Sequence, residues 1–143
     1  MTDQSSLPEP SETLDELARR TIGAAIEVHR HLGPGFLESV YEQALCLELA
    51  DRDLGFDRQV RIDVFYKGKP VGNGLADIIV EDALLLELKS VSQLAAVHRA
   101  QTKSYLWAAN LRLGLLLNFN SPLLKDGLER IINPDARERV GKE

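Results

Sequence analysis

Residues 75–89, LADIIVEDALLLELK, decide the fold, because they hold two apolar runs separated by a short acidic connection. The runs Leu75–Val80 and Ala83–Leu88 are nearly continuous in hydrophobic residues. This pattern is typical of strands that are covered on both faces. We therefore expect a hairpin at the centre of a sheet.

Two carboxylates interrupt these runs, Asp77 in the first and Glu87 in the second. An isolated buried carboxylate costs several kcal/mol unless a cation or hydrogen-bond donors compensate it. Lys89 follows Glu87 by two residues, so both side chains project to one face of a strand. In one interpretation Glu87 and Lys89 are an ordinary ion pair and Asp77 lies at a solvated edge. In the other, two acids and a lysine converge on a site whose hard oxygen ligands suit Mg²⁺ or Mn²⁺.

The register of the hairpin distinguishes these interpretations. Directly opposed residues in an antiparallel hairpin share a face, and their residue numbers have a constant sum. For Asp77 and Glu87 that sum is 164, which centres the connection on Asp82. A three-residue connection would set the two acids side by side, whereas a two-residue turn would put them on opposite faces unless a bulge intervenes. We predict the odd-length connection or a bulge.

The flanking segments show helical spacing before the hairpin and mixed patterns after it. A helix is predicted over Thr13–Leu32, with Ser11 as its N-cap and Gly33 at its end. The remaining elements predicted are a helix over Phe36–Asp53, a strand over Gln59–Tyr66, a turn at Lys67–Pro70, a helix over Gln93–Asn110, a strand over Leu113–Phe119, and a strand or short turn over Leu128–Ile132. The sequence thus predicts an α/β fold, a mixed β-sheet flanked by helices in the order α-α-β-β-β-α-β, followed by a small C-terminal element.

Length and composition are those of one globular domain. The chain has 143 residues and a formal charge of −5, which taken alone argues against a nucleic-acid partner. The charge is uneven, at −8 over residues 1–57 and +3 over residues 58–143. We expect a disordered leader at 1–12, a domain at 13–133 and a charged tail at 134–143. The single cysteine, Cys46, and the lack of an apolar run long enough for a membrane span lead us to expect a cytoplasmic protein.

Three motifs carry a resemblance to known nucleases. The spacing of Asp77 and then Glu87-Leu88-Lys89 resembles the signature of the PD-(D/E)XK nuclease superfamily. Residues 35–41, GFLESVY, resemble the motif of the GxxExxY protein family within it, and residues 22–29 and 114–119 are also similar to that family. Residues 101–105, QTKSY, fit the QxxxY pattern of the RecB-like branch. The resemblance implies a restriction-endonuclease-like core.

The resemblance also implies roles for individual residues. Asp77 and Glu87 would be metal ligands, with the Leu88 carbonyl as a third, and Lys89 would position or deprotonate the attacking water. Glu38 corresponds to an extra acid near the metal, Gln101 would lie beside the lysine, and Tyr105 would reach towards a substrate phosphate. Tyr41 is either core packing or a supporting residue, and His98 either joins the face of Gln101 and Tyr105 or is an exposed histidine.

One feature departs from the family pattern. Members often carry a basic residue shortly before the strand aspartate, whereas this chain has Gly74-Leu75-Ala76 there. Arg99 and Lys103 are the first candidates for contacts to nucleic acid. The other candidates for a phosphate contact are Arg58, Arg61, Lys67 and Lys69.

The expected function is therefore hydrolysis of DNA or RNA by a Mg²⁺-dependent (or Mn²⁺-dependent) nuclease. The alternative is a catalytically silent binding or accessory module that acts with a partner protein, since fold alone does not fix function. Cleavage of both strands of a duplex would favour a homodimer.

Overall fold

Five strands form one mixed sheet in the order β1-β2-β3-β4-β5, in which only β3 and β4 run parallel. The computed structural model describes residues 9–138. Its elements are α1 (Glu12–Leu32), α2 (Glu38–Asp51), β1 (Phe56–Tyr66), β2 (Lys69–Val80), β3 (Leu84–Lys89), α3 (Ala96–Ala108), β4 (Leu113–Asn118), the 3-10 helix η1 (Leu124–Gly127) and β5 (Leu128–Ile132). The predicted α/β fold and element order are confirmed.

The central hairpin has the predicted odd-length connection. Ile78 pairs with Leu86, Ile79 with Leu85 and Val80 with Leu84, so each pair sums to 164. Glu81 and Asp82 in the connection both adopt positive φ, at 53° and 56°. This left-handed pair turns the chain tightly enough to preserve the register that aligns Asp77 with Glu87.

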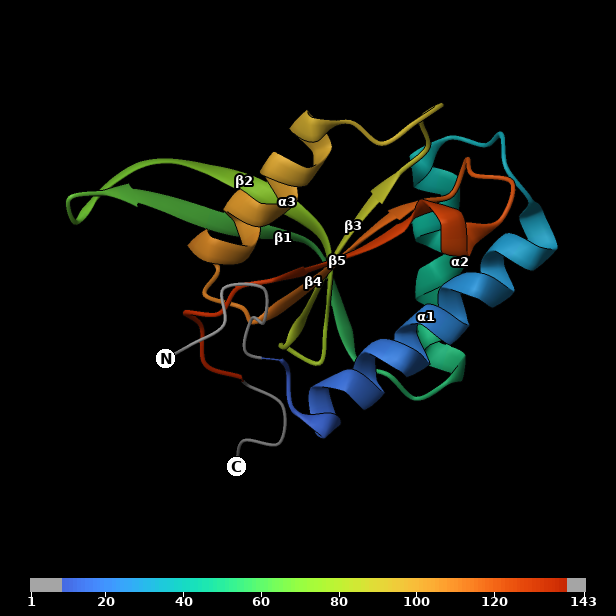
Figure 1. Ribbon diagram of the computed structural model, residues 1–143, viewed down its shortest axis with the longest axis horizontal. Coiled ribbons are helices and arrows are strands. Elements are labelled where there is room, and N and C mark those ends of the chain that lie inside the picture. Colours follow the sequence, from blue (N-terminus) through green and yellow to red (C-terminus); the bar gives the residue numbers. More distant parts are fainter. Residues whose placement is uncertain (1–8, 139–143) are drawn as a thin grey trace, which may run out of the picture.

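Two layers of helix cover the sheet on opposite faces, with α1 and α2 on one side and α3 on the other (Figure 1). Alternate residues of β3 serve the two layers: Leu84 and Leu86 pack in the core beneath α1 and α2, and Leu85 packs in the smaller core beneath α3. All three leucines are fully buried, and each contributes about 2 kcal/mol through burial. Double coverage explains why β3 is apolar at nearly every position.

Both ends of the described chain are tied to the domain. Ser11 caps α1 as predicted, accepting a hydrogen bond from the Leu14 N–H at 3.2 Å, and its own N–H donates to Glu138. Residues 134–138, predicted as part of a charged tail, pack against the domain, where the Arg112 guanidinium donates to the carbonyls of Pro134 and Ala136. The rest of the predicted leader and tail, residues 1–8 and 139–143, lies outside the described residues.

None of the helices in the described part of the chain combines the length and the apolar character that a membrane crossing requires.

Strands β1 and β2 are longer than the sequence predicted and project from the body as a two-stranded arm (Figure 1). Residues 69–74, which the sequence analysis left between a turn and a strand, continue β2 and pair with β1. The sequence does not show the alternation of a strand over residues 69–74, because Gly72 and Gly74 have weak strand propensity and no side chain.

The base of the arm is fixed by Tyr105 of α3. A Cβ atom placed on Gly74 would lie 2.5 Å from the Tyr105 ring, so only glycine leaves room for that ring. A Cβ atom on Gly72, two residues away in the same strand, would meet nothing within 4 Å.

We predict that Gly74→Ala lowers the free energy of unfolding by about 1–3 kcal/mol, because the added methyl group forces the Tyr105 ring to move. The matched variant Gly72→Ala has no such neighbour and serves as the control. Chemical denaturation of both variants measures the difference. In a chain that already carries Tyr105→Ala, Gly74→Ala should cost much less stability than it does in the wild type. Equal losses of stability in Gly74→Ala and Gly72→Ala would contradict this packing.

Candidate active site

The β2–β3 ladder ends in two hydrogen bonds that involve carboxylates. Beyond the last backbone pair, Ile78 and Leu86, the Leu88 N–H donates to Asp77 Oδ2 at 2.7 Å and the Asp77 N–H donates to Glu87 Oε2 at 3.1 Å. Side chains thus replace the carbonyls that would otherwise continue the ladder. The two acids lie side by side where β2 separates from β3.

These acids are held in an environment that favours protonation. Glu87 is 3% exposed, and burial, followed by the charge of Asp77, raises its pKa to about 8. Burial likewise raises the pKa of Asp77, and the charges of Glu42 and Glu38 add to this effect. Among residues 9–138, no lysine, arginine or histidine forms an ion pair with either acid. The simple Glu87–Lys89 ion pair is therefore not formed.

Lys89 points its ammonium group towards α3. Its Nζ lies 3.4 Å from Oε1 of Gln101, a long hydrogen bond. The backbone of Lys89 is fixed more firmly, since its carbonyl accepts from the Phe119 N–H at 2.9 Å. The structure therefore brings Gln101 and Lys89 together next to Glu87.

Helix α2 presents two acids to the pair. Glu38 is the first residue of α2 and is exposed, and Glu42 lies one turn later and is 8% exposed. The negative charge of Glu38 contributes to the raised pKa of both Asp77 and Glu87, and that of Glu42 to the raised pKa of Asp77.

Glu42 is a site residue that the sequence analysis missed. Its carboxylate accepts from Arg58 Nε at 3.1 Å and from Gln59 Nε2 at 3.0 Å, both in β1. Gln59 adopts φ 48°, a left-handed conformation inside a strand that places it in reach of Glu42. The i, i+4 spacing of Glu38 and Glu42 was the available signal, because residues four apart share a helical face.

Tyr41 braces the loop that leads into α2. It is fully buried and stacks on Phe119 with ring centroids 4.7 Å apart. Its hydroxyl donates to the Gly33 carbonyl at 2.5 Å and accepts from the Phe36 N–H at 3.1 Å. Tyr41 therefore fixes the start of the helix that carries Glu38, and its hydroxyl bonds to that loop.

A second brace holds the loop after β3 and was not singled out in the sequence. Asn118, at the end of the parallel neighbour β4, is 2% exposed and bonds to both the N–H and the carbonyl of Val91. The Ser90 hydroxyl donates to the Phe36 carbonyl at 2.6 Å. The chain on both sides of Lys89 is thereby anchored.

The remaining candidates from α3 make contacts within the chain. Nδ1 of His98 accepts from the Ala95 N–H at 2.9 Å and so caps α3. Tyr105 packs on Gly74. Arg99 forms a two-pronged ion pair with Glu129 of β5, at 2.7 and 2.9 Å. Lys103 places its Nζ 5.3 Å from the centre of the Trp107 ring.

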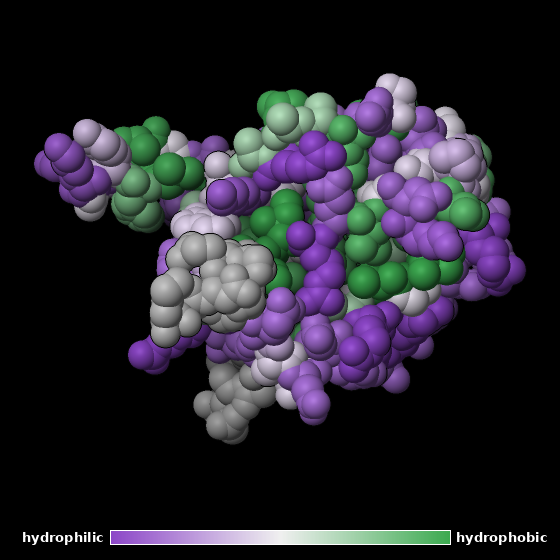
Figure 2. Space-filling model, viewed as in Figure 1, coloured by the Kyte–Doolittle hydropathy of each residue, from purple (hydrophilic) through white to green (hydrophobic). Residues whose placement is uncertain are grey.

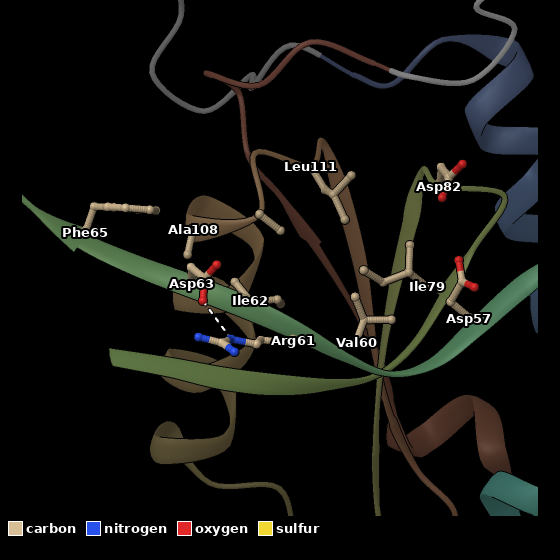
Figure 3. Close-up of a pocket in the computed structure, with 11 residues that line it drawn as sticks. Asp57, Val60, Arg61, Ile62, Asp63, Phe65, Ile79, Asp82, Ala108 and Leu111 are labelled. Atoms are coloured by element: carbon tan, nitrogen blue, oxygen red, sulfur yellow. Dashed lines mark hydrogen bonds and ion pairs between the residues drawn. The ribbon is translucent and has the colours of Figure 1, made fainter. Parts of the chain in front are cut away.

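A hollow of about 340 Å³ lies between β1 and the C-terminal end of α3 (Figure 3). Val60, Ile79 and Leu111 form part of its apolar wall, and Arg61 and Asp63 pair on its rim at 2.9 Å. None of the predicted metal ligands or catalytic residues lines it, and Arg61, one of the candidate phosphate contacts, is paired with Asp63 there. The candidate site is therefore the open end of the β2–β3 ladder, where the two predicted strand acids meet.

The donors at that open end fit a hard divalent cation. Each carboxylate uses one oxygen for a backbone N–H, and the other oxygen of Asp77 and of Glu87 has no hydrogen-bond partner among residues 9–138. Within the same residues, no cluster of three or more His, Cys, Asp or Glu side chains is arranged to hold a metal. A site with two carboxylates suits Mg²⁺, which retains several waters and is commonly bound through one or two such groups.

These features define a class: an α/β domain with an acid on one strand, an acid and a lysine two residues apart on the next, and further acids on the preceding helix. The chain belongs to the PD-(D/E)XK nuclease superfamily, whose family model matches residues 15–131. Searches among curated proteins and among solved structures gave no significant match.

The buried carboxyl group of Glu87 predicts how stability depends on pH. The pKa of Glu87 is about 8 in the folded chain against 4.5 for the free group, so the folded chain holds this proton more tightly. Stability in EDTA should therefore fall as the pH rises from about 4.5 to about 8, by up to about 5 kcal/mol. Chemical denaturation at a series of pH values measures this fall, and Glu87→Gln should remove most of it.

Asp82→Asn, an exposed acid in the hairpin connection, is the matched control and should retain the fall. Added Mg²⁺ should stabilise the wild type more strongly as the pH rises, because the ion binds deprotonated carboxylates. Stability that stays level or increases across the window would contradict the assigned burial of Glu87.

Proposed function

We propose that this chain is a metal-dependent nuclease that hydrolyses phosphodiester bonds in DNA or RNA. The observation that carries the proposal is the pair of half-buried Asp77 and buried Glu87, which lie side by side with no cation paired to them in the described chain. Such a pair is unfavourable by itself and becomes favourable around a divalent ion. Membership of a nuclease superfamily supplies the reaction class.

Asp77, Glu87 and the Leu88 carbonyl would hold the ion. The Leu88 N–H points to Asp77 across the open ladder, and the carbonyl of a strand residue points to the same side as its N–H. A bound Mg²⁺ or Mn²⁺ would supply an activated water and stabilise negative charge at the phosphate.

Lys89 would orient the attacking water, and its positive charge would stabilise the negative charge that develops on the phosphate. The contact between Lys89 Nζ and Gln101 Oε1 keeps the ammonium group on the α3 side of Glu87. Gln101 therefore acts as a positioning residue. Arg99 is already paired with Glu129, so a direct phosphate contact would require that pair to open, whereas Lys103 retains a charge that no described acid neutralises.

We further assign the chain to the GxxExxY family and to the RecB-like branch of the superfamily. The support is Gly35, Glu38 and Tyr41 in the first motif, and Gln101 with Tyr105 in the second. The position of Glu38 agrees with a role near the metal, since its charge reaches both strand acids. A buried free thiol at Cys46 favours action in the cytoplasm.

The test is a cleavage assay over supercoiled, linear and single-stranded DNA and over RNA, with Mg²⁺, Mn²⁺ or EDTA. Asp77→Asn and Glu87→Gln should each lower cleavage about 100-fold or more, because they remove charge from the ligand set, and Lys89→Ala should lower it by a similar factor. EDTA should abolish cleavage.

Asp82→Asn is the matched control, since it removes a carboxylate outside the site and asparagine tolerates the positive φ at that position. Circular dichroism on each variant shows that the fold is retained. Cleavage that persists in the Asp77 and Lys89 variants would refute the mechanism. Binding of nucleic acid without cleavage under any of these metals would instead identify a silent binding module.

A further inference from the structure

The tip of the β1–β2 arm combines exposed apolar side chains with positive charge. Phe65, Tyr66 and Val71 are 60%, 63% and 61% exposed. Residues 60–75 contain three cations and one acid, a net charge of +2, in a chain whose total is −5. Figure 2 shows hydrophobic colour along the arm and hydrophilic colour at its outer end. The arm therefore exposes a surface that the domain's own packing does not explain.

Lys67 occupies a position in which lysine is unfavourable. The turn Lys67-Gly68 joins the strands with φ angles of 51° and 81°, a two-residue turn with positive φ at both central positions. Asn or Gly is preferred at the first of these, because a longer side chain is strained in the left-handed conformation. Lys67 Nζ lies 5.3 Å from the centre of the exposed Tyr66 ring, so the cation and the aromatic ring form one exposed surface at the turn.

We infer that this tip, residues 65–71, binds the groove of double-stranded DNA while the acid pair engages the backbone. This inference rests on the proposed function. Lys67 and Lys69 would contact phosphates, and Phe65, Tyr66 and Val71 would contact base edges and thymine methyl groups. A two-stranded ribbon has the width that the major groove of B-form DNA admits.

The geometry of the arm favours a duplex as the occupant. Eight residues of β2 separate Asp77 from Lys69, a reach of about 26 Å along a strand. This corresponds to about 7–8 base pairs of duplex. The base of the arm is fixed, because Tyr105 packs on Gly74 and Ile62 joins the core beneath α3. A stiff ligand of matching length can therefore contact the tip of the arm and the acid pair at the same time.

Charge favours a DNA duplex over a second copy of the chain as the ligand of the tip. Pairing the tips of two arms would bring Lys67 and Lys69 against the same lysines of the other copy, which is unfavourable. A duplex supplies the opposite charge. An RNA duplex fits less well, because its major groove is deep and narrow.

The experiment measures binding in EDTA, which separates it from hydrolysis. Fluorescence anisotropy compares two DNA probes. A duplex of 20 base pairs is long enough to span the arm, and a hairpin-capped duplex of six base pairs is too short. The double variant Lys67→Asn/Lys69→Gln should bind the long duplex about tenfold or more weakly. Its plot of log affinity against log salt should be flatter by about 1.8, the value for two lost phosphate contacts.

Three controls complete the design. Lys125→Gln removes an exposed lysine from η1, at the end of the molecule opposite the arm (Figure 1), and should leave both quantities unchanged. The six-base-pair probe, which offers fewer phosphates to the tip, should bind the wild type more weakly than the long duplex does. The double variant should melt at or above the wild-type temperature, because asparagine suits the turn.

Equal binding of the long duplex by the wild type and the double variant would overturn the inference. A double variant that changes only the oligomeric state in sedimentation would also overturn it and make the tip an interface between copies. The two proposals fail separately: duplex binding through the arm without cleavage refutes the nuclease alone, and cleavage with an unaffected arm variant refutes the arm alone.

Discussion

The two hydrogen bonds at the open end of the β2–β3 ladder hold the site together. Leu88 donates to Asp77, and Asp77 donates to Glu87, so each acid is fixed by the backbone of the opposite strand. An extended ladder would have required carbonyls at these positions and would have left no gap between the strands. Because side chains form these hydrogen bonds in place of carbonyls, the sheet opens at the point where half-buried Asp77 meets buried Glu87.

In the absence of a cation, placing two acids side by side raises the free energy of the folded chain, and the surrounding structure maintains this arrangement. The core beneath α1 and α2 fixes one face of β3, and the core beneath α3 fixes the other. Tyr41, Ser90 and Asn118 then hold the loops on either side. The raised pKa of Glu87 is the direct result, since burial and a neighbouring acid both oppose ionisation. Rigidity of this kind holds the two carboxyl groups side by side.

Four left-handed residues set the course of the strands around the acid pair and the arm. Gln59 of β1 donates to Glu42 beside the acid pair, and Glu81 and Asp82 set the register of the hairpin. Lys67 turns the tip of the arm. Gln59, Glu81 and Lys67 depart from the local preference of their residue types, whereas aspartate tolerates this conformation at residue 82.

The sequence by itself determined the element order, the central hairpin and the alignment of Asp77 with Glu87. These follow from short-range periodicity and from the length of one connection, which a linear pattern records. Only the tertiary structure decided that Glu42 joins Arg58 and Gln59, that Tyr105 rests on Gly74, and that residues 69–74 extend an arm. These depend on contacts between distant segments and on glycines whose missing side chains leave no pattern, so packing alone reveals them.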